Sequence, residues 1–238
     1  PVFASSAKSR AEVLVRQMTL WEKCMLISGK KGGFHTFGIE RLGIPSIRMA
    51  DGPQGVRNNT KSTFYPCGIS LAATWNPSLA VAMGRGIGLD CKARGIGVLL
   101  GPGVNIYRSA HCGRNFEYYG EDPFLTSEIA CGYITGIQNE GVIATVKHFA
   151  ANNQEEWRHR TNSVVDERTL NEIYFPVFKN AIKKARVGAL MTSYNPLNGV
   201  HMAENRELIE GLIREQWGFE GIVMSDWLST YTTIGCVE

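Results

Sequence analysis

Short apolar segments alternate along this sequence with longer segments that begin at helix-capping residues, and this alternation constrains the fold more than any other feature. The apolar segments predict strands at 44–49, 69–74, 98–106, 142–149, 189–194 and 221–225. Each is apolar on both faces, which is typical of strands in a parallel sheet that helices cover. Between them, Asn or Asp residues, twice followed by Pro, predict helices at 76–94, 122–139, 166–185 and 205–216. The order strand, helix, strand indicates an α/β fold.

Ahead of the first predicted strand, apolar residues recur at helical spacing between residues 10 and 27. Within this segment Thr19 and Glu22 have the spacing of a capping box, in which each side chain bonds the backbone N–H of the other residue. We therefore expect an amphipathic helix that stops and restarts near Thr19.

Both an eight-stranded barrel and a doubly wound open sheet satisfy this alternation, and the positions of the polar residues favour the barrel. Polar side chains follow several different predicted strands, and no glycine-rich loop follows the first one. A barrel brings all these strand ends to one mouth, whereas an open sheet binds ligands at one switch point. We predict an α/β fold of the (β/α)8 TIM-barrel type. Because six strands are counted, we expect residues 1–238 to form one barrel domain that is truncated before its last one or two βα units.

Composition argues against several classes of protein. The net charge of +3 is small and dispersed, so no nucleic-acid partner is expected, and no apolar run reaches the roughly 20 residues of a membrane span. The six cysteines form no CxxC pair and have no histidine at zinc-finger spacing, so we expect neither a metal nor a cofactor. Free thiols favour a cytoplasmic over a secreted location, which the sequence leaves open.

The segment 221–227 ends in a carboxylate and an indole, Asp226 and Trp227. Taken alone, this segment favours Asp226 as a helix cap over Asp226 as a reactive acid above the sheet, because Asp caps are far more common. The residues that follow the other predicted strands include carboxylates, guanidinium groups, a lysine, a histidine and a tyrosine. Charged side chains of this kind bind sugar hydroxyls in fixed directions, and an indole packs against the apolar face of a sugar ring. The set indicates a carbohydrate site.

Six motifs in order make the sequence resemble the barrel domain of glycoside hydrolase family three, in its β-glucosidase branch. They are MADGPQGVR at 49–57, NIYR followed by CGRNFEYYGEDP between 105 and 123, VKHFAANNQE at 146–155, VDER at 165–168, MTSYN at 191–195 and VMSDW at 223–227. The resemblance covers nearly the whole chain.

The resemblance implies hydrolysis of terminal β-D-glucosyl residues by a retaining mechanism, with Asp226 as the nucleophile. It also implies a set of sugar-binding residues: Asp51, Arg57, Arg114, Lys147, His148, Arg158, Met191, Tyr194 and Trp227. An Asp at position 51 favours glucosides, because β-xylosidases of the family tend to carry Glu there. The acid/base carboxyl in such enzymes is a Glu on a second α/β domain that this sequence does not contain. This chain alone is therefore expected to be weakly active or inactive.

Two readings from other classes stay open at this stage. Lys147, at the end of a central predicted strand, has the position of a Schiff-base lysine in an aldolase-like barrel. The same site would also suit a module that binds sugar without cleaving it. In addition, Lys147 and His148 are neighbours on one strand, where strict alternation would turn only one of them inward.

Overall fold

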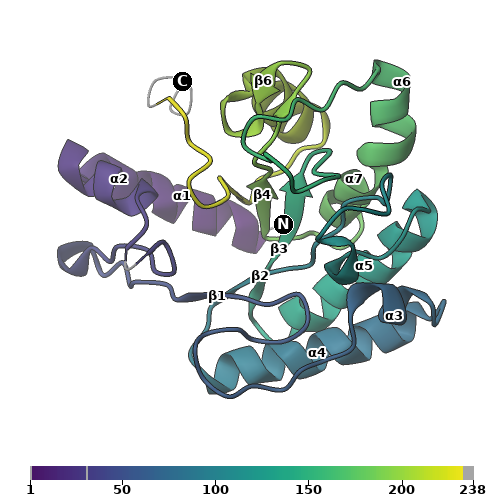
Figure 1. Cartoon of the computed structure of the whole chain (residues 1–238). Helices are drawn as coiled ribbons and strands as arrows, with labels where there is room; N and C mark the ends of the chain where they lie inside the picture. The colour runs from purple at the N-terminus through teal and green to yellow at the C-terminus, as the bar shows by residue number, and fades with distance from the viewer. Residues whose placement is uncertain (1, 31, 233–238) are drawn as a thin grey trace. The chain divides into compact units, whose positions relative to one another are not determined.

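The computed structural model describes residues 2–30 and 32–232 of the chain, which divide into two compact units at residues 1–49 and 50–238 (Figure 1). In the described part of the chain, no helix is both long and apolar enough to cross a lipid bilayer. The fold is α/β, as predicted, with a parallel sheet and covering helices in the second unit.

The first unit holds two helices, α1 (Val2–Gln17) and α2 (Leu20–Ile27), and the 3-10 turn η1 (Glu40–Leu42). The predicted break is confirmed, because the Thr19 hydroxyl accepts the Glu22 N–H at 3.2 Å while the Glu22 carboxylate accepts the Thr19 N–H at 2.8 Å. Arg41 then bonds both oxygens of the same carboxylate. A sequence-local capping box thus sets the start of α2 and presents Glu22 to a residue on a distant turn.

The sheet of the second unit has the strand order β1-β2-β3-β4-β7. Its strands are β1 (Met49–Asp51), β2 (Val98–Leu100), β3 (Ile143–Phe149), β4 (Ala189–Thr192) and β7 (Ile222–Met224). The pairs β2/β3, β3/β4 and β4/β7 are parallel, with Met191 opposite Met224 in the last pair. A separate two-stranded sheet, β5 (Pro196–Leu197) with β6 (Val200–His201), is antiparallel.

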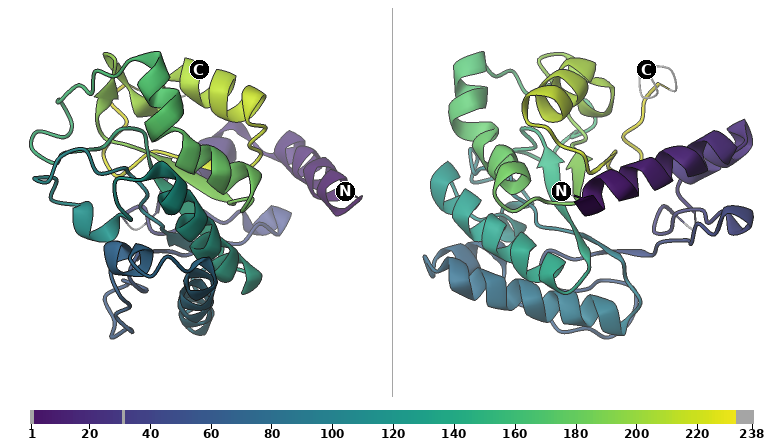
Figure 2. Two further views of the ribbon diagram at one scale, coloured as in Figure 1. Left: turned by 90° about the vertical axis from the view of Figure 1, so that its right-hand side faces the viewer. Right: turned by 180° about the vertical axis from the view of Figure 1, so that it is seen from behind.

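Helices connect these strands where the sequence predicts them (Figure 2). They are α4 (Pro77–Ala93), α5 (Pro123–Asn139), the run α6 (Glu167–Thr169), η3 (Leu170–Tyr174) and α7 (Pro176–Lys183), and the π-helical segment η5 (Glu207–Gln216). Asn76, Asp122 and Asp166 cap α4, α5 and α6 as expected, each accepting backbone N–H bonds of the first turn. Short turns, η2 (Asn115–Glu117) and η4 (Met202–Glu204), lie in the loops.

Three strand predictions need correction. Residues 69–74 are not a strand, because Gly68–Ala72 forms the short helix α3, which buries Gly68, Leu71 and Ala72. Their spacing of three and four residues matches one helical face, a pattern that so short an apolar run cannot distinguish from a strand. The first strand is shifted to Met49–Asp51 rather than 44–49, and the third ends at Leu100 rather than at residue 106. The described residues therefore contribute five strands to the main sheet.

Helices α4 and α5 pack closely because glycines line their contact, and they lie side by side in Figures 1 and 2. A Cβ on Gly84 would lie 2.2 Å from the carbonyl oxygen of Tyr133, and one on Gly136 would lie 2.2 Å from that of Val81. Both distances are far inside van der Waals contact, so the backbones approach at a separation that only glycine allows.

A methyl group at this contact is expected to destabilise the chain, although alanine favours a helix more than glycine does. Gly136→Ala should lower the free energy of unfolding by roughly 2 kcal/mol, measured by urea denaturation, because the neighbouring backbone must move. The matched control is Gly211→Ala in η5, where a Cβ meets nothing within 4 Å. That substitution should be neutral or stabilising by up to about 1 kcal/mol. Equal effects at the two positions would contradict the close packing of α4 and α5.

Candidate active site

Because β3, β4 and β7 are parallel, their carboxyl ends place the predicted site residues along the same edge of the sheet. Lys147 and His148 are the last residues of β3 before Phe149, and both are buried. Because Met191 on β4 pairs with Met224 on β7, Tyr194 and Asp226 follow neighbouring strands by a few residues each. The register between β3 and β4 is irregular between Val146 and Phe149, which interrupts strict alternation where Lys147 and His148 lie.

Asp51 at the end of β1 is the acceptor for two cations. The Lys147 ammonium, with its side chain 4% exposed, donates to Asp51 Oδ1 at 2.7 Å, and Arg57 pairs with Oδ2. Burial raises the pKa of the Asp51 carboxyl, but Lys147 and then Arg57 and Arg114 outweigh it, so the net shift is downward. Asp51 is therefore held as a carboxylate, and Arg57, with a side chain 77% exposed, lies at the outer rim.

Arg114 and Arg158 are each held by a glutamate of their own loop. Arg114 donates to buried Glu117, and Arg158 donates to Glu155 at 2.6 Å. Burial alone would lower the pKa of the Arg114 guanidinium. The nearby Tyr118, Glu117 and Glu155 raise this pKa by more than burial lowers it, so the net shift is upward and the group stays charged. These pairs fix the direction in which each guanidinium points.

His148 is clamped by a buried asparagine. Its backbone N–H donates to Asn105 Oδ1 at 2.9 Å, and its carbonyl accepts from Asn105 Nδ2 at 2.9 Å. Burial, followed by the charges of Arg114, Lys147 and Arg158, lowers the pKa of the His148 imidazole well below its ordinary range. His148 is thus a neutral imidazole, and its Nε2 lies 3.5 Å from Asp226 Oδ2.

Asp226 has one satisfied carboxyl oxygen and one that is not. Oδ1 accepts the N–H of Trp227 at 2.7 Å, whereas Oδ2 is buried without a well-formed hydrogen bond among the described residues. Burial raises the pKa of this carboxyl above its ordinary value of 3.8, and Tyr194, the Trp227 N–H, Lys147 and Arg114 reduce the shift. A buried, oriented carboxylate oxygen with a free lone pair is the arrangement that a nucleophile requires.

The remaining predicted residues surround this carboxyl group. Tyr194 is buried and acts electrostatically on Asp226, and the Arg158 guanidinium carbon lies 3.9 Å from the centre of its ring. Met191 on β4 is buried, and Trp227 is partly exposed directly beside the carboxylate. Contacts and electrostatic interactions thus join seven charged or aromatic candidates into one cluster with Asp226, and Trp227 adjoins Asp226 in sequence.

Several residues of this cluster escaped the sequence-based set. Glu117 and Asn152 are buried polar residues, Asn105 holds His148, and Tyr118 places its hydroxyl 3.4 Å from His148 Nδ1. All four lie within the motifs quoted above, close in sequence to Arg114 or His148. That sequence proximity was the only indication that they could belong to the site. Side-chain direction, which decides whether they reach the site, is not readable from a sequence.

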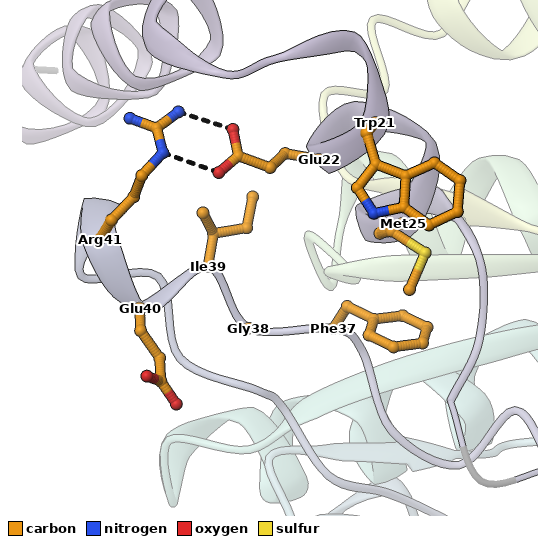
Figure 3. A pocket seen from close by; sticks show the side chains of 8 residues that line it. All are labelled: Trp21, Glu22, Met25, Phe37, Gly38, Ile39, Glu40 and Arg41. Carbon is orange, nitrogen blue, oxygen red and sulfur yellow. Dashed lines mark hydrogen bonds and ion pairs between the residues drawn. The ribbon is translucent and has the colours of Figure 1, made fainter.

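A separate hollow of about 290 Å3 lies within the first unit and has a different character (Figure 3). Its lining includes the apolar side chains of Trp21, Met25 and Phe37, with the Glu22–Arg41 ion pair along one side. The pair satisfies both charged groups, and none of the predicted site residues lines this hollow. Within the described residues, no group of three or more His, Cys, Asp or Glu side chains is placed to hold a metal ion.

Comparisons with known proteins find similar sequences and folds over nearly the whole chain. The sequence profile of the Glycosyl hydrolase family 3 N terminal domain matches residues 35–237. Thermostable beta-glucosidase B of Acetivibrio thermocellus is 48% identical over 226 residues, which cover 90% of this chain and 30% of that protein. The crystal structure of a GH3 beta-glucosidase from Bifidobacterium adolescentis matches with a TM-score of 0.91 at 43% identity, over 93% of this chain and 33% of that one.

A third match is DesR, a beta-glucosidase from Streptomyces venezuelae whose structure contains D-glucose. It gives a TM-score of 0.91 at 43% identity, over 95% of this chain and 30% of that one. The chain therefore spans about 30% of the length of these relatives.

Replacing the two central carboxylates by amides of the same shape is expected to change stability in opposite directions. Asp226→Asn should raise the free energy of unfolding at pH 7 by roughly 1 kcal/mol, because the raised pKa means that ionised Asp226 opposes folding. Asp51→Asn should lower it by roughly 3 kcal/mol, because Lys147 then remains buried without its counter-charge. Urea denaturation of the two variants beside the unchanged protein measures both effects.

The same experiment at lower pH checks the cause. The advantage of Asp226→Asn should disappear as the pH falls through the raised pKa towards 3.8, because protonated Asp226 is then neutral as well. The deficit of Asp51→Asn should persist to lower pH and shrink only below 3.8, as the pH falls through the lowered pKa of Asp51. Stability changes of the same sign at pH 7 would show that the two environments are not opposite.

Proposed function

This chain belongs to glycosyl hydrolase family 3, and we propose that it forms the sugar-binding part of a retaining β-glucosidase that removes terminal β-D-glucosyl residues. The observation that carries the proposal is the buried Asp226 Oδ2, which has no well-formed hydrogen bond among the described residues and lies in the field of the Lys147 and Arg114 charges. Its relatives are named beta-glucosidases, and DesR holds D-glucose in its structure.

In the proposed first step, Asp226 Oδ2 forms a bond to the anomeric carbon while the bond from that carbon to the leaving oxygen breaks. The Trp227 N–H holds Oδ1, so the carboxylate keeps one orientation as Oδ2 attacks. Neutral His148 lies 3.5 Å from Oδ2 and adds no positive charge that would weaken the nucleophile. Water then cleaves the glycosyl ester with retention of configuration.

Sugar hydroxyls would be bound by the charged residues around Asp226. Asp51 accepts hydrogen bonds, while Lys147, Arg114 and Arg158 donate them, and each is already fixed by a partner of opposite charge. Such fixed groups pay little conformational entropy when a sugar binds. Arg57 at the rim, Met191 below and Trp227 beside the nucleophile complete the proposed subsite.

The acid/base carboxyl is proposed to come from a part of the protein outside this sequence. A retaining enzyme needs a second carboxyl group about 5 to 5.5 Å from the nucleophile. The glutamates of the cluster, Glu117 and Glu155, are engaged with Arg114, Arg158 and Asn152. The chain covers about 30% of its relatives, which leaves ample room for such a domain in them.

The two alternative readings receive less support. A Schiff-base lysine must present a neutral amine, whereas Lys147 forms a 2.7 Å ion pair with Asp51. A module that only binds sugar does not require a buried carboxyl oxygen that lacks a well-formed hydrogen bond among the described residues. The geometry thus favours the glycosidase.

Trapping the covalent intermediate tests the nucleophile. Incubation with 2-deoxy-2-fluoro-β-glucosyl fluoride should attach one fluoroglucosyl group to Asp226, because fluoride leaves with its bonding electrons and needs no protonation. Peptide mass spectrometry locates the label. Asp226→Asn should take up no label, while Asp166→Asn, at the cap of α6, serves as the control and should be labelled normally. A label at another residue would overturn the proposed mechanism, and borohydride trapping of a carbonyl compound on Lys147 would support the aldolase-like reading.

The labelling rate should fall at low pH with a midpoint above 3.8. The reason is that only ionised Asp226 attacks, and burial raises the pKa of this carboxyl above that ordinary value. A midpoint below 3.8 would contradict the burial of the nucleophile.

The side-chain length at position 51 should select the sugar. Asp51→Glu moves the carboxylate one methylene further into the subsite and crowds the hydroxymethyl group of glucose. We expect the ratio of labelling by 2-fluoroglucosyl to 2-fluoroxylosyl fluoride to fall by about tenfold, which corresponds to the loss of one well-fitted group. Asp90→Glu, on α4 outside the cluster, is the control. An unchanged ratio in Asp51→Glu would show that Asp51 does not contact that part of the sugar.

A further inference from the structure

Tyr194 lies beside the proposed nucleophile. Its ring contacts a guanidinium group and an imidazole ring, both from the loop that follows β3. The Arg158 guanidinium carbon lies 3.9 Å from its ring centre. The His159 imidazole centre lies 4.6 Å from the same ring centre, at an interplanar angle of 57°. The ring that acts on Asp226 is therefore positioned by two consecutive residues of another loop.

Tyr231, from the segment after β7, joins this arrangement through its hydroxyl group. The hydroxyl donates to the backbone carbonyl of Tyr194 at 3.2 Å and lies 2.7 Å from His159 Nδ1. A tyrosine hydroxyl has one proton, so if that proton goes to the Tyr194 carbonyl, His159 must donate to the Tyr231 oxygen. Both bonds are made at once only when His159 carries its proton on Nδ1.

The same segment is anchored on both sides of the nucleophile. Before Asp226, β7 pairs with β4 at Met224 and Met191. After it, the N–H and hydroxyl of Ser229 donate to the Asp226 carbonyl at 3.1 and 2.8 Å, and Tyr231 reaches back to Tyr194. The segment that carries Asp226 is thus tied to the end of β4 at both of its own ends.

We propose that His159 and Tyr231 are positioning residues for Asp226. His159 holds the ring of Tyr194, and its Nδ1–H fixes the Tyr231 hydroxyl, which in turn fixes the Tyr194 backbone. Neither residue was in the predicted site, and neither is asked to touch the sugar. This inference rests on the proposed function, because it assigns a role in the attack by Asp226.

His201 supplies a matched control within the same cluster. Its ring stacks on Tyr231 with 3.7 Å between centres, and its buried Nδ1 has no hydrogen-bond partner among the described residues. Phenylalanine at this position keeps the stacking and removes no hydrogen bond made by Nδ1 to those residues. His201→Phe therefore tests packing alone, whereas Tyr231→Phe removes the hydrogen-bonding hydroxyl and keeps a ring.

The tautomer of His159 is measurable without any activity. The experiment is a long-range 1H–15N spectrum of the chain with 15N-labelled histidines. The signals of His159 are those that disappear in His159→Gln, and they should show a His159 ring protonated on Nδ1. Tyr231→Phe should abolish this preference, and His201→Phe should preserve it. A neutral His159 protonated on Nε2 in the unchanged protein would overturn the proposed hydrogen-bond relay, whatever the outcome of the labelling experiments.

The kinetic arm uses the fluoroglucosyl fluoride described above and separates attack from binding. Tyr231→Phe should lower the saturating labelling rate of Asp226 about tenfold, because a small misplacement of a reacting group costs rate. The half-saturating concentration should stay within about twofold, since no sugar contact is lost. His159→Asn, whose amide nitrogen overlies Nδ1, should retain more activity than His159→Gln, whose amide overlies Nε2.

The outcomes distinguish the two proposals. No labelling of Asp226 in the unchanged protein would overturn the proposed function, and the tautomer would still decide whether the relay exists. Normal labelling of Asp226 with equal rates in Tyr231→Phe, His201→Phe and the unchanged protein would overturn the positioning role alone. A loss in Tyr231→Phe that appears only in the half-saturating concentration would also overturn it, because it would place the residue in sugar binding.

Discussion

The ion pair between Lys147 and Asp51 is the interaction on which the candidate site depends. Lys147 lies near the carboxyl end of β3 inside an apolar sheet, where an ammonium without a partner would be too costly to bury. Asp51, on the end of β1, provides the counter-charge at 2.7 Å and joins two strands that are not neighbours in the sheet. Because this pair is nearly closed to solvent, it fixes the position of the charges that the other site residues meet.

The two aspartates show how one type of side chain can lie in two opposite electrostatic environments within a single cluster. Cations outweigh burial at Asp51, whose pKa is lowered, whereas burial outweighs the cations at Asp226, whose pKa is raised. The opposite pKa shifts follow from direct contact, since Asp51 forms ion pairs with Lys147 and Arg57. The charges of Lys147 and Arg114 also act on Asp226, but neither residue forms an ion pair with it. A carboxylate held by ion pairs is suited to bind, and one left free is suited to react.

Sequence patterns predicted the local structure, and the family motifs identified distant residues that the structure brings together, but individual long-range contacts outside the motifs were missed. The caps at Asn76 and Asp122 placed two helices because capping bonds join residues two or three positions apart. Residues 69–74 were wrongly predicted to be a strand, since burial of Leu71 and Ala72 on a helical face produces the same local composition. The contact of His159 with Tyr231 spans 72 positions and has no sequence pattern, so only the three-dimensional structure reveals it.

Buried and half-buried side-chain amides explain how loops from separate strands hold one geometry. Asn105 bonds the backbone of His148 twice, Asn153 bonds the carbonyl of Ile106, and Asn195 bonds that of Ala150. Each amide belongs to the loop after one strand and its acceptor to the loop or end of a neighbouring strand. Since an amide both donates and accepts in a fixed plane, it fixes direction as well as distance. The parallel sheet therefore sets where the strand ends lie, and the asparagines fix the loops that follow those ends around Asp226.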